Sequence, residues 1–196
     1  IVGDLFDFWF EYRTVIPRGH MKVLAALARL NELGREVHYI AGNHDFWMRD
    51  FLTTELGIPV HFDGKEFVIN NRRFFLHHGD GVKKKDGGYH LMKRVFRNKF
   101  NIFLYSLLHP DLGIPLAKWV AQTSRNHNSH SGPPDDQELA QQKFQEGVDY
   151  VIFGHLHWPM LMPYGEKKYV NLGDWIEYFS YARFDGEELE LLRWER

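Results

Sequence analysis

The chain has 196 residues, of which 44% are hydrophobic, 16% are aromatic and none is cysteine. This composition suffices for the core of one globular domain and excludes disulfide bonds and thiolate metal sites. The formal net charge of −2 argues against a nucleic-acid partner, and no apolar run reaches the roughly 18 residues of a membrane span. The sequence therefore predicts a cytoplasmic globular enzyme.

The chain opens with a strand and a helix. A strand ending at Val2 leads into Gly3 and Asp4, and Asp4 is a candidate metal ligand because it directly follows the glycine. Residues Arg18–Leu33 carry apolar side chains at helical spacing and precede a glycine. This pattern predicts a helix that serves packing.

The central stretch is Glu36–Trp47, a β-rich run followed by Gly42-Asn43-His44-Asp45. A buried strand that ends at a polar loop is typical of α/β folds, which place their chemistry at the carboxyl ends of strands. A short helix is expected over Asp50–Leu56. A hairpin over Glu66–Leu76, turning at two asparagines, then leads to His77-His78-Gly79-Asp80.

Residues 83–130 interrupt the alternation of strands and loops, and we interpret them as a helical cap inserted into a single domain of residues 1–196. Helices are expected over Leu91–Leu108, which is unusually aromatic, and over Asp111–Thr123. The basic residues of the cap are Lys83, Lys84, Lys85, Lys93, Arg94, Arg97 and Lys99. Such a cap could hold an acyl chain beside an anionic head group or rest on an anionic membrane. It could equally be ordinary core with a solvated cationic face.

The remainder of the chain is rich in strands. A polar helix over Asp136–Glu146 precedes a strand, Tyr150–Phe153, that ends in Gly154-His155-Leu156-His157. Two hairpins are expected after it, over Met160–Leu172 and from Phe179 to Trp194.

Four short β-rich runs share one feature, because each ends in glycine beside Asp, Asn or His. The candidate ligands are Asp4, Asn43, His78, His155 and His157. Their oxygen and nitrogen donors suit borderline divalent metals. His77 alternates with His78 along its strand, so we expect it on the opposite face, in the core. The pattern predicts a metal centre assembled from several loops.

The order of these motifs, Gly-Asp, Gly-Asn-His-Asp, His-Gly-Asp and Gly-His-x-His, resembles the calcineurin-type metallophosphoesterase superfamily. Three stretches around these motifs indicate a particular family within the superfamily. Gly3–Phe10, Gly154–Pro159 and Leu172–Trp175 look like those of the UDP-2,3-diacylglucosamine pyrophosphohydrolases of lipid A synthesis. The resemblance extends from Ile1 to Trp194.

The resemblance implies an α/β fold, a four-layer αββα sandwich of mixed sheets with a helical cap. It also implies two divalent metal ions bridged by Asp4, with manganese favoured and iron or zinc acceptable to the same ligands. Asn43, His78 and His155 would complete the shell of one ion. His157 would bind the other.

The resemblance also assigns roles around the metals. His44 would stabilise charge on phosphorus or protonate the leaving oxygen, with Asp45 orienting its ring. Arg97 and Asn98 are candidate contacts for substrate phosphate or sugar. In the family, an Asp-x-His motif on an earlier strand supplies two more ligands to the second metal. No counterpart precedes Ile1 here, and we expect the native chain to begin earlier and to contain it.

The residues and the resemblance together predict a metal-dependent hydrolase that cleaves UDP-2,3-diacylglucosamine to UMP and 2,3-diacylglucosamine 1-phosphate. The expected partner is a lipid-linked nucleotide, with peripheral contact to the cytoplasmic face of the inner membrane. Two alternatives stay open. One is a phosphodiesterase or phosphatase of the same fold with a soluble substrate, and the other is a metal-poor scaffold that binds proteins.

Overall fold

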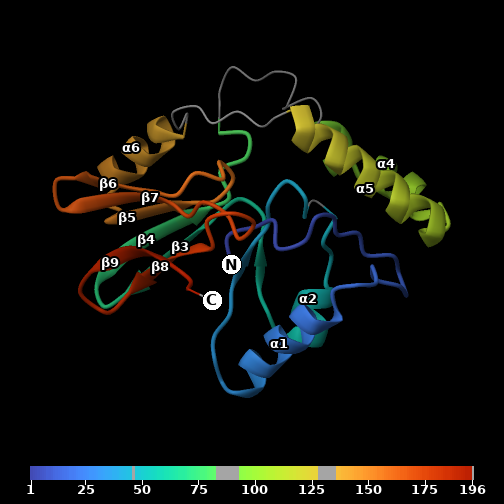
Figure 1. Cartoon of the computed structure of the whole chain (residues 1–196), viewed down its shortest axis with the longest axis horizontal. Coiled ribbons are helices and arrows are strands. Elements are labelled where there is room, and N and C mark those ends of the chain that lie inside the picture. The colour runs from blue at the N-terminus through green and yellow to red at the C-terminus, as the bar shows by residue number, and fades with distance from the viewer. Residues whose placement is uncertain (46, 83–92, 128–135, 196) are drawn as a thin grey trace. The chain divides into compact units, whose positions relative to one another are not determined.

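The computed structural model describes residues 1–45, 47–82, 93–127 and 136–195, with only the backbone of residues 121–127 (Figure 1). The chain divides into two compact units. Within the described ranges, the first comprises Ile1, Gly3–Phe62 and Lys84–Ser129, and the second comprises Val2, Asp63–Lys83 and His130–Arg196. The predicted basic residues Lys83, Lys84 and Lys85 lie outside the described residues.

The first unit contains a two-stranded parallel sheet and two short helices that share one core. β1 (Tyr39–Ile40) pairs with β2 (Val60–His61), α1 spans Met21–Glu32 and α2 spans Phe51–Leu56. The core combines residues of α1, α2 and β1, aromatic residues of the N-terminal loop and two residues that flank α2: Phe6, Trp9, Leu24, Leu27, Tyr39, Met48, Leu52 and Ile58. The loop that carries the first Gly-Asp pair is therefore anchored by its own aromatic side chains.

A helical hairpin also belongs to the first unit. Residues 93–97 are helical, α4 spans Lys99–Ser106 and α5 spans Pro110–His127. One face of the hairpin is packed against the N-terminal loop, through a cluster that includes Phe8, Phe10, Trp47, Ile102, Tyr105, Ile114 and Ala117. Among the described residues, no helix has both the length and the apolar character needed to cross a bilayer.

The second unit is built on a five-stranded mixed sheet with the order β3-β4-β5-β7-β6. Its strands are β3 (Lys65–Ile69), β4 (Arg72–His77), β5 (Tyr150–Phe153), β6 (Met160–Tyr164) and β7 (Lys167–Asn171). β4, β5 and β7 run parallel, and β3 and β6 pair with them in the antiparallel sense. Because β4 and β5 are parallel neighbours, the histidine motifs that follow them emerge at the same end of the sheet.

Different elements cover the two faces of this sheet (Figure 1). Alternate residues of β5 point to opposite faces. Val151 and Phe153 pack with α6 (Gln137–Gln145), whereas Tyr150 and Ile152 pack with the hairpin of β8 (Ser180–Phe184) and β9 (Leu189–Arg193). All four residues of β5 are buried, so the strand that leads to the Gly-His-x-His motif is held from both sides.

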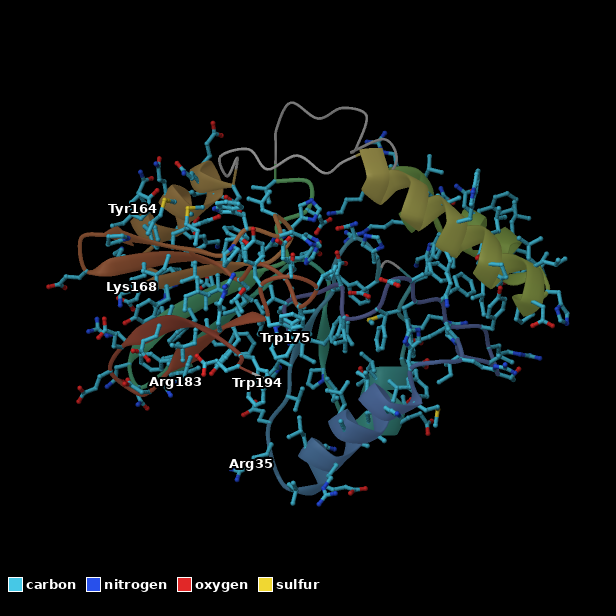
Figure 2. The ribbon with its side chains drawn as sticks, in the orientation of Figure 1. Arg35, Tyr164, Lys168, Trp175, Arg183 and Trp194 are labelled. Atoms are coloured by element: carbon cyan, nitrogen blue, oxygen red, sulfur yellow. The ribbon has the colours of Figure 1, made fainter. Side chains whose placement is uncertain are left out.

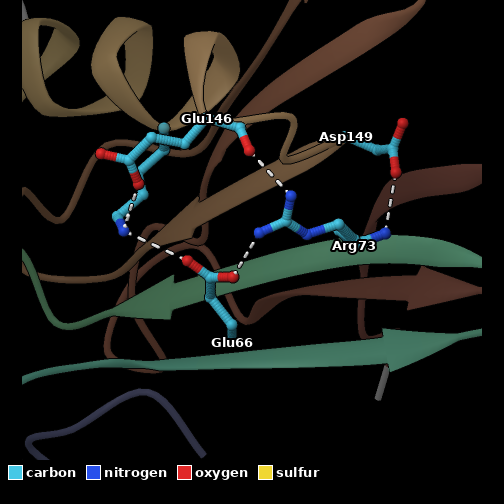
Figure 3. Close-up of polar contacts among 5 residues, drawn as sticks. Glu66, Arg73, Glu146 and Asp149 are labelled. Carbon is cyan, nitrogen blue, oxygen red and sulfur yellow. Dashed lines mark hydrogen bonds and ion pairs between the residues drawn. The ribbon is translucent and has the colours of Figure 1, made fainter.

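Charged side chains tie α6 to the sheet (Figure 3). Glu66 of β3 accepts hydrogen bonds from Arg73 of β4 at 2.8 Å and from Lys143 of α6 at 3.1 Å. Arg73 also donates to the Glu146 carbonyl at 2.7 Å, and Asp149 accepts the Arg73 backbone N–H at 2.7 Å. The network joins both ends of the connection between α6 and β5 to the neighbouring hairpin.

The predicted α/β class is confirmed, and several predicted elements differ in extent, among them the following three. The helix predicted from Arg18 begins at Met21, because residues 18 and 19 form a turn. The strand predicted within Glu36–Trp47 is limited to β1, whose partner β2 also has only two residues. The predicted helix over Leu91–Leu108 is interrupted at Asn98, whose side chain caps α4.

Candidate metal centre

In the first unit, the buried Asp45 organises the loop that follows β1. Its Oδ2 accepts hydrogen bonds from the Tyr39 hydroxyl at 2.8 Å and from the Gly42 N–H at 3.2 Å. It also accepts the backbone N–H of Asp4 at 2.7 Å. One carboxylate oxygen thereby joins β1, the Gly-Asn-His-Asp loop and the first Gly-Asp loop.

The negative charge of Asp4 raises the pKa of the Asp45 carboxyl group. The pKa of Asp45 is raised to about 7, first by burial and then by Asp4, against hydrogen bonds from Tyr39, Gly42 and Asp4 that lower it. The Asp45 Oδ1 atom is buried and has no hydrogen-bond partner among the described residues. A buried carboxyl group whose pKa is raised by a neighbouring carboxylate suits the presence of a cation, which would relieve the repulsion between the two.

The Asp4 side chain occupies space that only a glycine at position 42 leaves open. Its Oδ1 accepts the His44 N–H at 2.9 Å, and a Cβ added at Gly42 would lie 2.2 Å from this oxygen. Asp4 itself has φ 52°, in the left-handed region that is costly for residues other than glycine. The carboxylate is therefore held in one defined position against the loop.

The His44 ring is oriented by a backbone carbonyl. Its Nδ1 lies 2.8 Å from the carbonyl oxygen of Asp7, so Nδ1 carries hydrogen and the lone pair or a second proton resides on Nε2. We expected Asp45 to orient this ring. Its carboxylate accepts hydrogen bonds from Tyr39, Gly42 and Asp4, and the role of Asp45 toward His44 stays a prediction. Asn43 lies in the same turn and is half-buried.

In the second unit, β4 and β5 bring two histidines together. Nε2 of His78 lies 3.3 Å from Nδ1 of His155, and the ring centroids are 5.1 Å apart. The backbone supports this pair, because the His78 carbonyl accepts the N–H groups of Gly154 at 2.9 Å and His155 at 3.0 Å. His77 packs on Phe153, as its alternation with His78 predicted.

The Val2 carbonyl determines the tautomer of His78. Nδ1 of His78 lies 3.0 Å from this oxygen, which can only accept, so Nδ1 carries a hydrogen and the lone pair of the neutral ring is on Nε2. A backbone carbonyl on one ring nitrogen is the usual support for a histidine that binds metal through the other. The donor chemistry of His78 and His155 therefore fits a divalent cation.

His157 pairs with Asp174, a residue that we had not predicted as its partner. Nδ1 of His157 lies 3.4 Å from Asp174 Oδ2, while Asp174 Oδ1 accepts the N–H groups of Ile176, Glu177 and Tyr178. Burial alone raises the Asp174 pKa, but these donors and His157 outweigh it and the net pKa is lowered. The charged Asp174 thus holds His157 and the loop that follows β7.

The predicted ligands divide between the two units. Asp4, Asn43 and His44 belong to the first, and His78, His155 and His157 belong to the second. The covalent chain links the two groups, because Val2, the hydrogen-bond partner of His78, is followed after one residue by Asp4.

The two predicted substrate contacts have structural partners. The Asn98 side chain accepts the N–H groups of Phe100 and Asn101, and Arg97 donates to the Phe62 carbonyl at 3.4 Å. A substrate role for Arg97 and Asn98 therefore stays a prediction.

A family model described as calcineurin-like phosphoesterase matches residues 1–159. The chain belongs to this family. This phosphoesterase is similar to the UDP-2,3-diacylglucosamine hydrolase of Porphyromonas gingivalis, with 38% identity over 97% of this chain and 80% of that protein. It is 26% identical to the UDP-2,3-diacylglucosamine hydrolase of Proteus mirabilis over 98% and 83% of the two chains. A structure of an archaeal phosphodiesterase covers 89% of this chain and 78% of its own, with 13% identity and a TM-score of 0.43.

Family membership makes the chain a hydrolase of phosphate esters and implies divalent metal ions. The expected superfamily and the expected relation to the lipid A hydrolases are both confirmed by these comparisons.

Proposed function

We propose that this phosphoesterase hydrolyses the pyrophosphate of UDP-2,3-diacylglucosamine to UMP and 2,3-diacylglucosamine 1-phosphate. The observation that carries the proposal is the 38% identity to the Porphyromonas gingivalis hydrolase, which extends over 97% of the chain. The candidate ligands Asp4, Asn43, His78, His155 and His157 all lie within that span and support the proposal.

We propose that the cofactor is a pair of manganese ions. Asp4 offers a carboxylate oxygen, and His78 and His155 each offer a ring nitrogen. With Asn43, they would hold one ion, and Asp4 would share the second with His157. Oxygen and nitrogen donors without thiolates accept Mn²⁺, and they also accept Fe²⁺ or Zn²⁺. When bound, such a pair polarises the phosphate and lowers the pKa of water.

The residues of the chain itself would bind and orient the substrate. Because His44 Nδ1 donates to the Asp7 carbonyl, a proton on Nε2 can be given to the leaving oxygen or can stabilise charge on phosphorus. Asp45 would act at a distance from the reacting atoms, by holding Asp4 and the loop that carries His44.

The outer face of the helical hairpin supports contact with lipid. While one face of α4 and α5 is packed, apolar side chains on the rest of the hairpin are at least 41% exposed: Phe100, Phe103, Leu104, Leu107, Leu108, Leu112, Leu116, Trp119 and Val120. Lys99 lies at the start of α4, and Lys118 lies on α5. An exposed apolar face bearing cations suits the surface of an anionic membrane. We propose that the hairpin rests on the cytoplasmic face of the inner membrane.

The test is release of UMP from UDP-2,3-diacylglucosamine by the manganese-loaded chain. Release that is lost in His155→Ala supports the proposal. Turnover of bis-p-nitrophenyl phosphate without turnover of the lipid would instead assign a phosphodiesterase with a soluble substrate. Failure with both substrates in a chain with bound metal would overturn the enzymatic proposal.

A further inference from the structure

An aromatic platform stands directly beside His157 in the second unit. Trp158 follows His157 in the chain and is 51% exposed. Its ring meets the Tyr178 ring at a centroid distance of 6.1 Å and an interplanar angle of 70°. The guanidinium of Arg193 lies 5.3 Å from the centroid of Tyr178. The indole therefore has a fixed edge contact and a large surface open to solvent.

The same residues that orient His157 also position this platform. Asp174 pairs with His157 and accepts the backbone N–H of Tyr178 at 3.1 Å. His157 has φ 51°, in the left-handed region, a conformation that persists for such a residue only where the surroundings enforce it. The direction in which the chain leaves toward Trp158 is therefore fixed together with the imidazole.

Exposed, preorganised aromatic rings are the usual binding surface for nucleobases, because every base has a π-face that stacks on them. In a 5′-nucleotide, the base is separated from its phosphate by one ribose. A base-binding ring must therefore lie close to the groups that handle the phosphate. Trp158 meets this condition because it adjoins His157, and the neighbouring charges of Asp174 and Arg193 disfavour an acyl chain at the same place.

We propose that Trp158 is the stacking platform for the uracil ring of the uridine nucleotide, with Tyr178 and Arg193 holding the indole in position. The inference rests on the proposed function, which supplies the uridine nucleotide. The metal ligands would act on the phosphate groups, whereas the inference concerns the uracil ring. It assigns Trp158, the aromatic residue of the Gly-His-x-His-Trp sequence, to substrate binding.

The experiment compares the equilibrium binding of UMP and ribose 5-phosphate to the manganese-loaded chain by calorimetry. We expect UMP to bind about tenfold more tightly than ribose 5-phosphate, because stacking on one aromatic ring contributes on this order. Trp158→Ala should abolish that difference, and Trp158→Phe should keep part of it. Ribose 5-phosphate should bind equally to all three proteins.

Trp194→Ala is the matched control. Trp194 is 58% exposed and is marked, with Trp175, on the second unit in Figure 2. It directly follows Arg193, the last residue of β9, and lies outside that strand. This variant should bind UMP like the unmodified protein.

The outcomes separate this inference from the proposed function. Equal binding of UMP and ribose 5-phosphate, or a UMP affinity unchanged by Trp158→Ala, overturns the uracil platform even if the lipid is hydrolysed. A selective loss of UMP binding in Trp158→Ala supports the platform even if the lipid is not a substrate.

Discussion

Nε2 of His78 and Nδ1 of His155 lie 3.3 Å apart although the residues are 77 positions apart in the sequence. The parallel pairing of β4 with β5 brings the two together, and the Val2 carbonyl turns the lone pair of His78 toward His155. A cation that accepts both rings would satisfy nitrogens that otherwise face one another. The parallel pairing of the two strands therefore places two potential metal-binding nitrogens next to each other.

Replacement of His155 tests the ligand assignment. Mutating a residue that only supports a metal ligand typically costs about 10–100-fold in activity. We expect His155→Ala to lower turnover of bis-p-nitrophenyl phosphate by more than this. The folded state should persist, because β5 and its core end before this residue. Turnover, metal content and circular dichroism measure these effects. His109→Asn, on the exposed turn before α5, should leave turnover unchanged, and full activity in His155→Ala would refute the assignment.

Asp174→Asn separates the charge of this side chain from its role in the loop. Asparagine keeps an oxygen for the N–H groups of Ile176, Glu177 and Tyr178 but removes the negative charge beside His157. We expect metal affinity or activity to fall about 10–100-fold.

Asp185→Asn is the control for this variant. Asp185 also accepts two backbone N–H groups, those of Glu187 and Glu188, in the exposed turn of the β8–β9 hairpin. Metal titration of both variants measures the difference. Equal affinity in Asp174→Asn and the unmodified protein would contradict the role assigned to the charge.

The Glu66 network predicts a pH-dependent contribution to stability. Hydrogen bonds from Arg73 and then Lys143 lower the Glu66 pKa below its ordinary value of 4.5. A carboxyl group with a lowered folded-state pKa stabilises the fold above its ordinary pKa, and this stabilisation is lost as the pH falls through the folded-state pKa.

We expect Glu66→Gln to lower the free energy of unfolding by about 0.2–1 kcal/mol at pH 7, since these groups are partly solvated. The corresponding fall in melting temperature is at most about 4 °C. The difference from the unmodified protein should shrink as the pH falls below the ordinary carboxyl pKa and vanish below the lowered folded-state pKa. Thermal unfolding at several pH values measures it, and Glu187→Gln in an exposed turn provides the control. A deficit that persists unchanged in acid would show that packing, and not charge, is responsible.

The exposed face of the helical hairpin predicts binding to anionic vesicles. Leu112 is 69% exposed on α5, and burying a leucine side chain in lipid is worth about 1.5–3 kcal/mol. We expect Leu112→Glu to weaken co-sedimentation with vesicles that contain phosphatidylglycerol by about tenfold or more. Leu33→Glu, at a position that is 63% exposed beyond α1, should bind like the unmodified protein. Equal loss in both variants would mean that the hairpin has no special role.

Local signals in the sequence were sufficient to predict most helices and strands of the second unit. Asn70 and Asn71 have φ of 49° and 61°, the left-handed turn conformation that these residue types tolerate and that the hairpin prediction required. The strand Tyr150–Phe153 was predicted with its observed bounds, because four buried β-formers are followed at once by glycine and histidine.

Contacts between distant segments could not be predicted in the same way. The bond from Tyr39 to Asp45 requires that the loop fold back over β1, and the pair of His157 with Asp174 requires that the loops after β5 and β7 meet. The interruption at Asn98 did have a local signal, because asparagine is a preferred N-cap. The aromatic periodicity on both sides obscured it.

Gly3 is the only residue between two anchor points. Before it, Val2 accepts a hydrogen bond from His78, and after it, Asp4 donates one to Asp45. Gly3 has φ 75°, a conformation that a residue with a side chain adopts only at a cost. An alanine at this position would have to adopt the same left-handed conformation, and its backbone strain would fall on the one residue that separates the two hydrogen bonds.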